Sequence, residues 1–402
     1  MTSTDRLPVA VDAMGGDKAP SEIVAGAIRA RDELGVPVVL VGRPEELTET
    51  GGLEVLPASE VIAMDADPGK SVRTMKDSSL VRAAEAVRDG RACAMVSAGN
   101  TGATMASALL RMKRLPGVFR PAIATPIPNP AGGNPTVLLD AGANAECSPE
   151  WLVQFAQMGA TFARTRYGIE NPKVGLLSIG EEPTKGSPLV KETHALLATG
   201  EWTESCGGTF VGNVEGRDIM SPDVDVIVTD GFTGNVVLKT LEGSMRSLVN
   251  AILGTFNTSD ETKAAGDVLF PALLPLYAQL DPNNTGGAML LGLNGVCIIS
   301  HGSSNDTAIV NAVKVATEMV DAGLVDAIAQ TIRPTDASPP VSRVPVLGSV
   351  DALGRVANPR RQPRASRPES GHLCTPEVQG RPDSRESARI GSPMHPRGAA
   401  VT

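Results

Sequence analysis

The stretch LPVAVDAMGGDKAPSEIVAGAIRARDELGVPVVLVG, residues 7–42, decides the fold, because strand and helix patterns alternate within it. Residues 7–13 are a short apolar run that predicts a strand. Residues 19–35 predict a helix, with a proline near its start and a glycine just past its end. Residues 36–42 are almost continuously apolar, which is typical of a strand buried on both faces. The stretch therefore predicts a strand–helix–strand unit.

The same alternation continues to about residue 323. Further candidate strands lie at 93–99, 122–127, 136–142, 173–180, 224–231 and 295–302. Further candidate helices lie at 79–89, 101–113, 149–166, 187–199, 233–256, 262–280 and 305–323. This order predicts an α/β fold: a doubly wound α/β/α sandwich around a mostly parallel sheet.

Composition narrows the class of protein. The 402 residues are 42% hydrophobic but only 3% aromatic, so the core must be built mainly from aliphatic side chains. The formal net charge of -9 argues against a nucleic-acid partner, because nucleic-acid binding relies on basic patches. The five cysteines are scattered and odd in number, which fits a cytoplasmic protein without disulfides or a cysteine-based zinc site. We find no signal-peptide pattern and no apolar run long enough to span a membrane.

The composition changes near residue 336. Residues 336–402 are rich in Pro, Arg, Ser and Gly and lack any helical or strand period, so we expect a disordered tail. Residues 1–335 then form one folded domain.

Polar, glycine-containing turns follow nearly every predicted strand. In open α/β sheets, ligands bind at the carboxyl ends of the strands. Each turn also presents the N-terminus of a helix, where free backbone N–H groups attract anions. The sequence therefore predicts that several turns converge on one crevice that binds a small anion.

The turn SAGNTG, residues 97–102, is a candidate phosphate site. Backbone amides, hydroxyls and an amide side chain are the donors that a phosphate needs. The candidate residues are Ser97, Gly99, Asn100, Thr101 and Gly102. A purely structural turn explains the pattern equally well, and neither GxGxxG nor GxxxxGK[ST] is present, so a nucleotide is not indicated.

Two further loops carry cations. Lys185 lies in a charged loop at 178–192, and Arg217 follows Asn213 in VGNVEGRDI, residues 211–219. An arginine there is a candidate to bind phosphate through its fork of donors. The alternatives are a solvated loop for Lys185 and simple pairing of Arg217 with neighbouring carboxylates.

Two other strand-end turns complete the candidate set. TDGFTGNVVLKT, residues 229–240, contains Asp230, Thr233 and Asn235, with Lys239 one helical turn later. SHGSSN, residues 300–305, contains His301 and Ser303. A hydrogen-bonded structural histidine remains an alternative, but the strand-end position favours a functional one.

Some motifs are absent from the sequence. No GxSxG elbow and no HExxH pattern occurs, and no cysteine lies beside a histidine in these turns. A covalent acyl-enzyme and a metal centre both lose support. We expect an enzyme that positions a small anion without a metal or a cofactor.

Seven segments in one order carry a family resemblance: DAMGGDKAP, SAGNTGATMASALL, LLDAGANAEC, GLLSIGEEPTKG, FVGNVEGRDI, DGFTGNVVLKT and GLNGVCIISHGSSN. Together they closely resemble the bacterial phosphate acyltransferases of phospholipid synthesis, from about Val9 to about Gly323. The resemblance implies a fold like that of the isocitrate and isopropylmalate dehydrogenases, and a homodimer. It implies transfer of a long fatty acyl group from acyl carrier protein to inorganic phosphate, with acyl phosphate as the product.

This chemistry needs no serine or cysteine nucleophile, because phosphate is itself an oxyanion. We assign phosphate to Gly99–Gly102, Lys185 and Arg217, and thioester polarisation to Asn235 or His301. Asp12 and Asp230 would orient cations or accept a proton. In the opening turn, Gly15 and Gly16 would let the backbone approach the ligand, with Asp17 organising its donors.

The segment from Met245 to Phe256 has a one-sided apolar stripe at helical spacing, and a second predicted helix follows, so that a hairpin would span about 244–281. Core or dimer packing explains most of the stripe. The resemblance also implies a protruding helical hairpin that touches the membrane, with Leu253 and Phe256 as exposed tip residues and a membrane glycerol-3-phosphate acyltransferase as a possible partner. For the acidic carrier protein we expect a basic docking patch at Arg111, Lys113 and Arg114.

Two other functions remain open. One is a short-chain phosphate acyltransferase that uses acyl-coenzyme A; the apolar hairpin favours long chains instead. The other is a non-catalytic scaffold that binds acyl carrier protein. A metal- and NAD-dependent dehydrogenase of the same fold is less well supported, because no dinucleotide motif is present.

Overall fold

The computed structural model describes residues 6–332. The predicted tail at 336–402 lies outside the described residues, so its disorder and the domain boundary before it stay predictions. The predicted strand–helix–strand unit is present: β1 (Val9–Asp12) leads through α1 (Ser21–Leu34) into β2 (Val38–Gly42), and β1 and β2 pair in parallel.

The remaining strands are β3 (Glu54–Pro57), β4 (Ala94–Ser97), β5 (Ala122–Ile127), β6 (Thr136–Leu139), β7 (Lys173–Leu177), β8 (Thr209–Val214), β9 (Val226–Val228), β10 (Ala288–Leu291) and β11 (Val296–Ile299). The remaining α-helices are α2 (Pro68–Thr74), α3 (Ser79–Arg88), α4 (Thr101–Arg111), α5 (Pro149–Tyr167), α6 (Pro188–Ala198), α7 (Thr203–Cys206), α8 (Gly231–Phe256), α9 (Asp260–Leu280), α10 (Asp306–Asp321) and α11 (Leu324–Thr331). Two 3₁₀ helices, η2 (Gly216–Met220) and η3 (Pro282–Asn284), follow β8 and α9.

All these strands join one sheet in the order β3-β2-β1-β4-β11-β10-β5-β6-β9-β7-β8. Most neighbours are parallel, but β10 is antiparallel to both β11 and β5, and β5 is antiparallel to β6. Three successive reversals make β6 and its parallel neighbours β9, β7 and β8 run opposite to β1, β4 and β11. The doubly wound, mostly parallel α/β/α prediction is confirmed, with two half-sheets of opposite direction.

This reversal changes the expected position of the turns. The turns after β1, β4 and β11 lie at one edge of the sheet, and those after β6, β7, β8 and β9 lie at the opposite edge. Several of the predicted turns therefore lie together at one edge, as expected, while the others lie at the opposite edge. Strand direction is set by pairing across the sheet, and no local sequence pattern reports it.

Helices cover both faces of the sheet, and a separate apolar core lies between the sheet and the helices on each face. One core packs α1, α5, α10 and α11 against the strands, with Phe155, Phe162 and Ile309 fully buried. The other packs α2, α3 and α4 and the first turns of α8, including partly buried Leu238 and Leu241. Strand residues alternate between the two cores, as side chains of a doubly covered sheet must.

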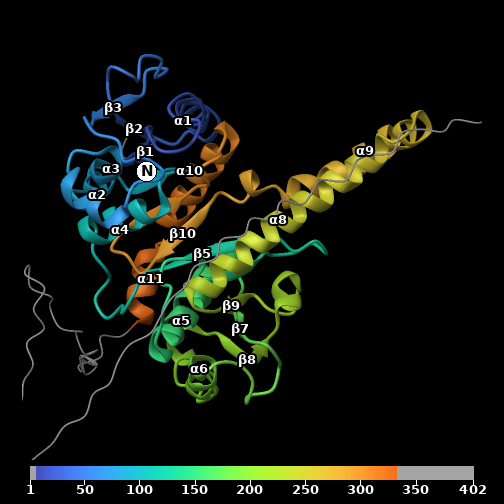
Figure 1. Ribbon diagram of the computed structural model, residues 1–402. Coiled ribbons are helices and arrows are strands. Elements are labelled where there is room, and N and C mark those ends of the chain that lie inside the picture. The colour runs from blue at the N-terminus through green and yellow to red at the C-terminus, as the bar shows by residue number, and fades with distance from the viewer. Residues whose placement is uncertain (1–5, 333–402) are drawn as a thin grey trace, which may run out of the picture. The chain divides into compact units, whose positions relative to one another are not determined.

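Helices α8 and α9 form a hairpin that leaves the sheet, and Figure 1 shows them running out together beyond the strands. The 26 residues of α8 would span about 39 Å at the usual helical rise. Its start packs on the sheet, whereas residues 243–255 are mostly exposed. The helical hairpin predicted at about 244–281 is therefore present. Among residues 6–332, no helix is long and apolar enough to cross a membrane.

Candidate functional site

The turn after β1 is organised around a buried carboxylate. Asp12 is fully buried, and its Oδ2 accepts a 2.7 Å hydrogen bond from the Ser97 hydroxyl at the end of β4. The same hydroxyl accepts the Gly99 N–H at 3.0 Å. Asp12 therefore fixes the start of the neighbouring glycine turn from beneath, and we expect it to shape the turn rather than to bind an anion directly.

Glycine is required where these two turns meet. A Cβ on Gly15 would lie 2.8 Å from the Gly99 amide nitrogen and closer still to Asp12 Oδ2. Gly16 has a φ of +114°, a conformation that side chains rarely adopt. The backbones of the two turns thus pack directly against each other, which brings their amide groups together.

The turn after β11 joins the same edge. The Asp17 N–H donates to the Gly302 carbonyl at 2.8 Å, and the Ser300 N–H donates to the Ser97 carbonyl at 2.8 Å. Backbone hydrogen bonds therefore link the turns at residues 12–17, 97–102 and 300–305 into one surface. The structure thus brings these sequence-predicted residues together, and their binding of phosphate stays a prediction.

A lysine from α8 reaches this surface. Lys239 Nζ lies 3.2 Å from His301 Nε2 and 2.9 Å from Glu242 Oε2, while Ser303 Oγ lies 3.0 Å from His301 Nδ1. Glu242 was not among the sequence-predicted residues. Although partial burial opposes its ionisation, the nearby His301 and Lys239 lower the pKa of Glu242 to about 2, and Lys239 donates a hydrogen bond to it. The charges of Lys239 and Glu242 offset each other, so this group brings an ammonium N–H donor to the glycine turns without a net charge.

Asp230 begins α8 at the opposite edge. Its carboxylate accepts both the backbone N–H (2.9 Å) and the hydroxyl (2.8 Å) of Thr233, as an N-cap does. Both side chains are thus used to start the helix. Asn235 is exposed one turn further on, and its side chain lies beside Gly142. The cap fixes where the Asn235 amide emerges.

A second buried carboxylate, missed by the sequence analysis, supports that edge. Asp140 is fully buried and accepts backbone N–H groups from Ile123, Gly142, Ala143 and Asn144, at 2.8–3.2 Å. Burial raises its pKa despite these bonds, and burial likewise raises the pKa of Asp12 despite hydrogen bonds from Ser79, Ser97 and Met14. Each half-sheet thus has one buried aspartate beneath its strand-end turns.

The cationic loops occupy the edge formed by β7 and β8. Arg217 is 68% exposed and contacts three carboxylates, with 3.0 Å to both Glu181 and Glu215 and 4.0 Å to Asp218. Arg217 is thus paired with neighbouring carboxylates, which is the alternative to phosphate binding that the sequence left open. Lys185 is exposed, and no ion pair is seen for its side chain within residues 6–332.

Two predicted phosphate ligands have side chains that are used within the fold. The buried Asn100 caps α4 through Ala103 N–H and donates to the carbonyls of Met64 and Ala66. Asn213 donates to the Glu182 carbonyl and bonds to His194 Nδ1. These amides hold loops in place.

The open donors of the 97–102 turn are instead its backbone amides. The first N–H groups of α4, at Thr101 and Gly102, have no partner within the helix because a helix leaves its first donors unpaired. Gly102 also packs closely against Pro68, since a Cβ there would lie 2.6 Å from the Pro68 Cγ.

Several proteins are similar to this chain in sequence. The model of the family described as "Fatty acid synthesis protein" matches residues 7–327. A phosphate acyltransferase of Elusimicrobium minutum is 48% identical over 335 residues, covering 81% of this chain and 96% of that protein. A phosphate acyltransferase of Halothermothrix orenii is 46% identical, covering 81% and 98%.

This chain belongs to the fatty acid synthesis protein family. It is an acyltransferase of that family, as the resemblance in the sequence implied. Solved structures support the fold alone: a phosphotransacetylase from Staphylococcus aureus superposes with a TM-score of 0.53 at 16% identity, covering 79% of this chain and 94% of that one. A phosphotransacetylase from Streptococcus pyogenes gives 0.50 at 19%, covering 82% and 94%.

Two of the three residues of the predicted carrier-protein patch make contacts within the fold. Arg111 Nε lies 3.6 Å from Glu85, and Arg114 donates to the carbonyls of Val118 and Phe119. Lys113 is exposed and has a positive φ of 69°. The docking role of these three residues stays a prediction.

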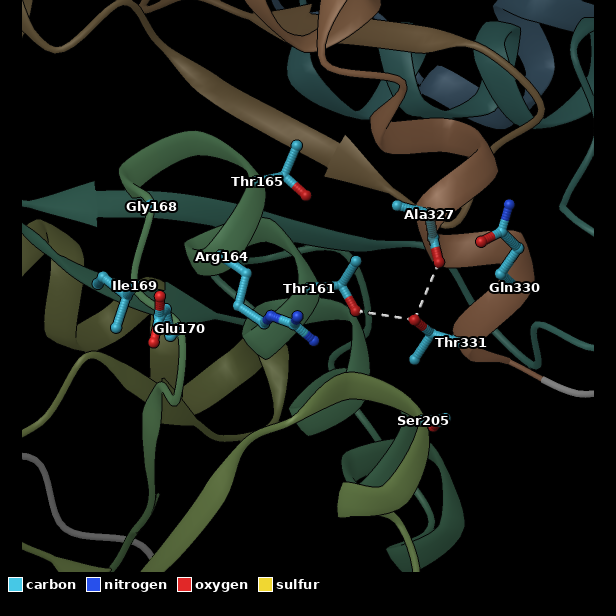
Figure 2. Close-up of a pocket in the computed structure, with 10 residues that line it drawn as sticks. All are labelled: Thr161, Arg164, Thr165, Gly168, Ile169, Glu170, Ser205, Ala327, Gln330 and Thr331. Carbon is cyan, nitrogen blue, oxygen red and sulfur yellow. Dashed lines mark hydrogen bonds between the residues drawn. The ribbon is translucent and has the colours of Figure 1, made fainter.

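One cavity lies away from these turns. It encloses about 400 Å³ between the end of α5 and α11, and Figure 2 shows Arg164 beside Thr161, which bonds to Thr331 at 3.1 Å. None of its ten lining residues belongs to the sequence-predicted site. Arg164 donates to the Cys206 carbonyl, so the cavity wall is held by structural contacts.

Proposed function

We propose that this acyltransferase transfers a long-chain fatty acyl group from acyl carrier protein to inorganic phosphate, releasing acyl phosphate for glycerophospholipid synthesis. The observation that carries the proposal is Lys239, held 3.2 Å from His301 where three glycine turns meet. This places a cation and free backbone amides on one surface. The family supports phosphate and an acyl group as the substrates.

The phosphate is proposed to bind the amides of the 97–102 turn, with Lys239 as its cation. One phosphate oxygen attacks the thioester carbonyl carbon and forms a C–O bond. The tetrahedral oxyanion then collapses, the C–S bond breaks, and the carrier thiolate leaves and takes up a proton. Thiols titrate near ~8.5, so this leaving group needs little assistance. Positioning and oxyanion stabilisation are what the protein must supply.

The carbonyl oxygen is proposed to be stabilised by Asn235 and Lys185. β9 and β7 pair in parallel, so the residues that follow them, the start of α8 and the 178–187 loop, lie at the same edge. Asn235 is exposed there, and α8 places it one turn before Lys239. Arg217 would join phosphate binding only by exchanging its carboxylate partners.

Thiol release from palmitoyl-acyl carrier protein, with and without inorganic phosphate, tests the proposal. We expect release that depends on phosphate, lost in Lys239→Ala and retained in Lys314→Ala, an exposed lysine of α10 that pairs loosely with Glu318. Release from acetyl-coenzyme A but not from the carrier substrate would instead establish the short-chain enzyme. Binding of carrier protein without turnover would establish the scaffold.

We propose a homodimer because the hairpin helix α9 exposes apolar side chains. A helix that is apolar on all sides belongs in an interior, yet α9 exposes six large apolar side chains: Val268, Leu269, Phe270, Leu273, Leu274 and Leu276. We propose that a second copy covers them. Light scattering should show dimers for the native chain and for Leu110→Arg, an exposed leucine elsewhere, and monomers for Leu269→Arg. Dimers of Leu269→Arg would contradict this packing.

Peripheral membrane contact is proposed at the hairpin turn, which would deliver the amphiphilic product to a membrane glycerol-3-phosphate acyltransferase. Leu253 is exposed there, but Phe256 packs against Gly266 of α9, unlike the expected exposed tip residue. Leu253→Asp should therefore weaken flotation with liposomes more than Leu110→Asp does. Equal flotation of the two variants would remove Leu253 from the contact.

A further inference from the structure

Glu242 lies at the junction between the hairpin helix and the glycine turns. It follows Lys239 by three positions on α8, so both side chains leave the same face of the helix. Its side chain is 22% exposed, whereas those of Lys239 and His301 are 52% and 45% exposed. The carboxylate is thus the inner member of the group, and the lysine and histidine lie toward solvent.

The contacts select one form of His301. Lys239 has only donors, so His301 Nε2 must accept from it at 3.2 Å. The proton of the neutral imidazole then resides on Nδ1 and faces Ser303 Oγ at 3.0 Å. Glu242 Oε2 lies 3.7 Å from His301 Nε2, too far for a good hydrogen bond, so the carboxylate acts on the imidazole through Lys239.

The lysine has one donor to spare. An ammonium carries three N–H groups, and the contacts seen for Lys239 within residues 6–332 use two of them, toward Glu242 and His301. The third faces neither partner and is available for a bound anion. An exposed lysine without such anchors would sample many rotamers and would direct no donor.

We propose that Glu242 is a positioning residue for acyl transfer: it holds Lys239 against His301, which fixes the Nδ1–H tautomer and aims the third ammonium N–H at the substrate phosphate. This rests on the proposed function of the site. The hydrogen bond from Lys239, which helps to lower the pKa of Glu242, agrees with a carboxylate that stays ionised throughout the working range.

Glu242→Gln tests the proposal because it keeps the shape and removes the charge. We expect kcat to fall on the order of 10–100-fold, the usual scale for a displaced catalytic group, with the KM for the acyl donor unchanged. Glu242→Asp should recover part of the loss. The matched control is Glu318→Gln, which removes the exposed carboxylate facing Lys314 on α10 and should leave kcat unchanged.

A nitrogen-15 NMR spectrum of the histidine-labelled protein measures the tautomer of His301, which should not change if Glu242 has only a structural role. The chain has four histidines, so His301 can be assigned by comparison with His301→Gln. We expect Nδ1–H in the native protein and a mixture of tautomers in Glu242→Gln.

An unchanged kcat or an unchanged tautomer in a folded Glu242→Gln overturns the proposal; if that variant does not fold, the same two readouts on Glu242→Asp decide. If the native enzyme shows no phosphate-dependent release, the proposed function fails, while the tautomer still reports whether Glu242 controls His301.

Discussion

Replacing Gly15 by alanine tests whether the packed turns form the site. The new Cβ would lie 2.8 Å from the Gly99 nitrogen and 2.9 Å from its Cα, and closer still to the Asp12 carboxylate. Carbon atoms do not approach backbone that closely, and neither neighbour is the free end of a flexible side chain. The turn at Gly15 must therefore move away from Gly99 by several tenths of an ångström at least.

The expected cost follows from that overlap. Overpacking a buried position costs about 1–3 kcal/mol, and a domain of more than 300 residues loses roughly 1–2 °C in Tm per kcal/mol. We expect Gly15→Ala to melt roughly 2–5 °C lower and to lose most of its phosphate-dependent thiol release. Differential scanning calorimetry and the release assay measure the two effects.

Gly69→Ala is the matched control. Gly69 is exposed in α2, and a Cβ there would meet only Asp67 Oδ1 at 3.8 Å. Alanine favours a helix over glycine by up to about 1 kcal/mol, so this variant should keep full activity and an equal or higher Tm. A Gly15→Ala enzyme with native Tm and native activity would refute the close packing and its link to the reaction.

Three further predictions concern the same edges. Urea unfolding should show Asp12→Asn gaining stability relative to the native chain as pH rises from about 4 to 7. Burial raises the pKa of Asp12 in the folded state above its unfolded value of 3.8. The stability that the protonated Asp12 contributes is therefore complete below pH 3.8 and is lost as pH rises through the folded-state pKa. Asn100→Ala should lower the free energy of unfolding by about 2–4 kcal/mol, since it removes a cap and leaves carbonyls of the 63–66 segment unpaired; a loss confined to the phosphate KM would instead show a ligand. Glu181→Gln should lower the phosphate KM if Arg217 binds phosphate, because it releases one of its carboxylate partners, and should leave KM unchanged if Arg217 only pairs with its neighbours.

The alternation of strands and helices could be predicted from the sequence, because strands that are buried on both faces of the sheet must be apolar along their length. The missed elements lack that signal. β3 is an edge strand with both end residues exposed, and β10 is a four-residue strand next to glycines. Strand direction could not be read at all, because the reversals at β10 and β5 arise from pairing between distant segments.

The candidate site shows the same division. Asp12 and His301 were predictable from their strand-end positions, but the contact of His301 with Lys239 joins residues 62 positions apart and has no local pattern. Asp140 did carry a signal, an aspartate that ends an apolar strand before glycine and asparagine, and that signal was not used. The carboxylates at positions 215 and 218 flank Arg217 in the sequence, which is why its pairing could be weighed beforehand.

The uninterrupted course of α8 constrains how the chain can vary in length. One residue inserted between Asn235 and Lys239 would rotate everything beyond it by about 100°. Lys239 would leave His301, and Leu241 would leave the core it packs against. Beyond Glu242 the helix is mostly in solvent, and an insertion of seven residues, about two turns, would lengthen the hairpin without disturbing its phase. Insertions and deletions in related sequences should therefore cluster after Glu242 and avoid the segment before it.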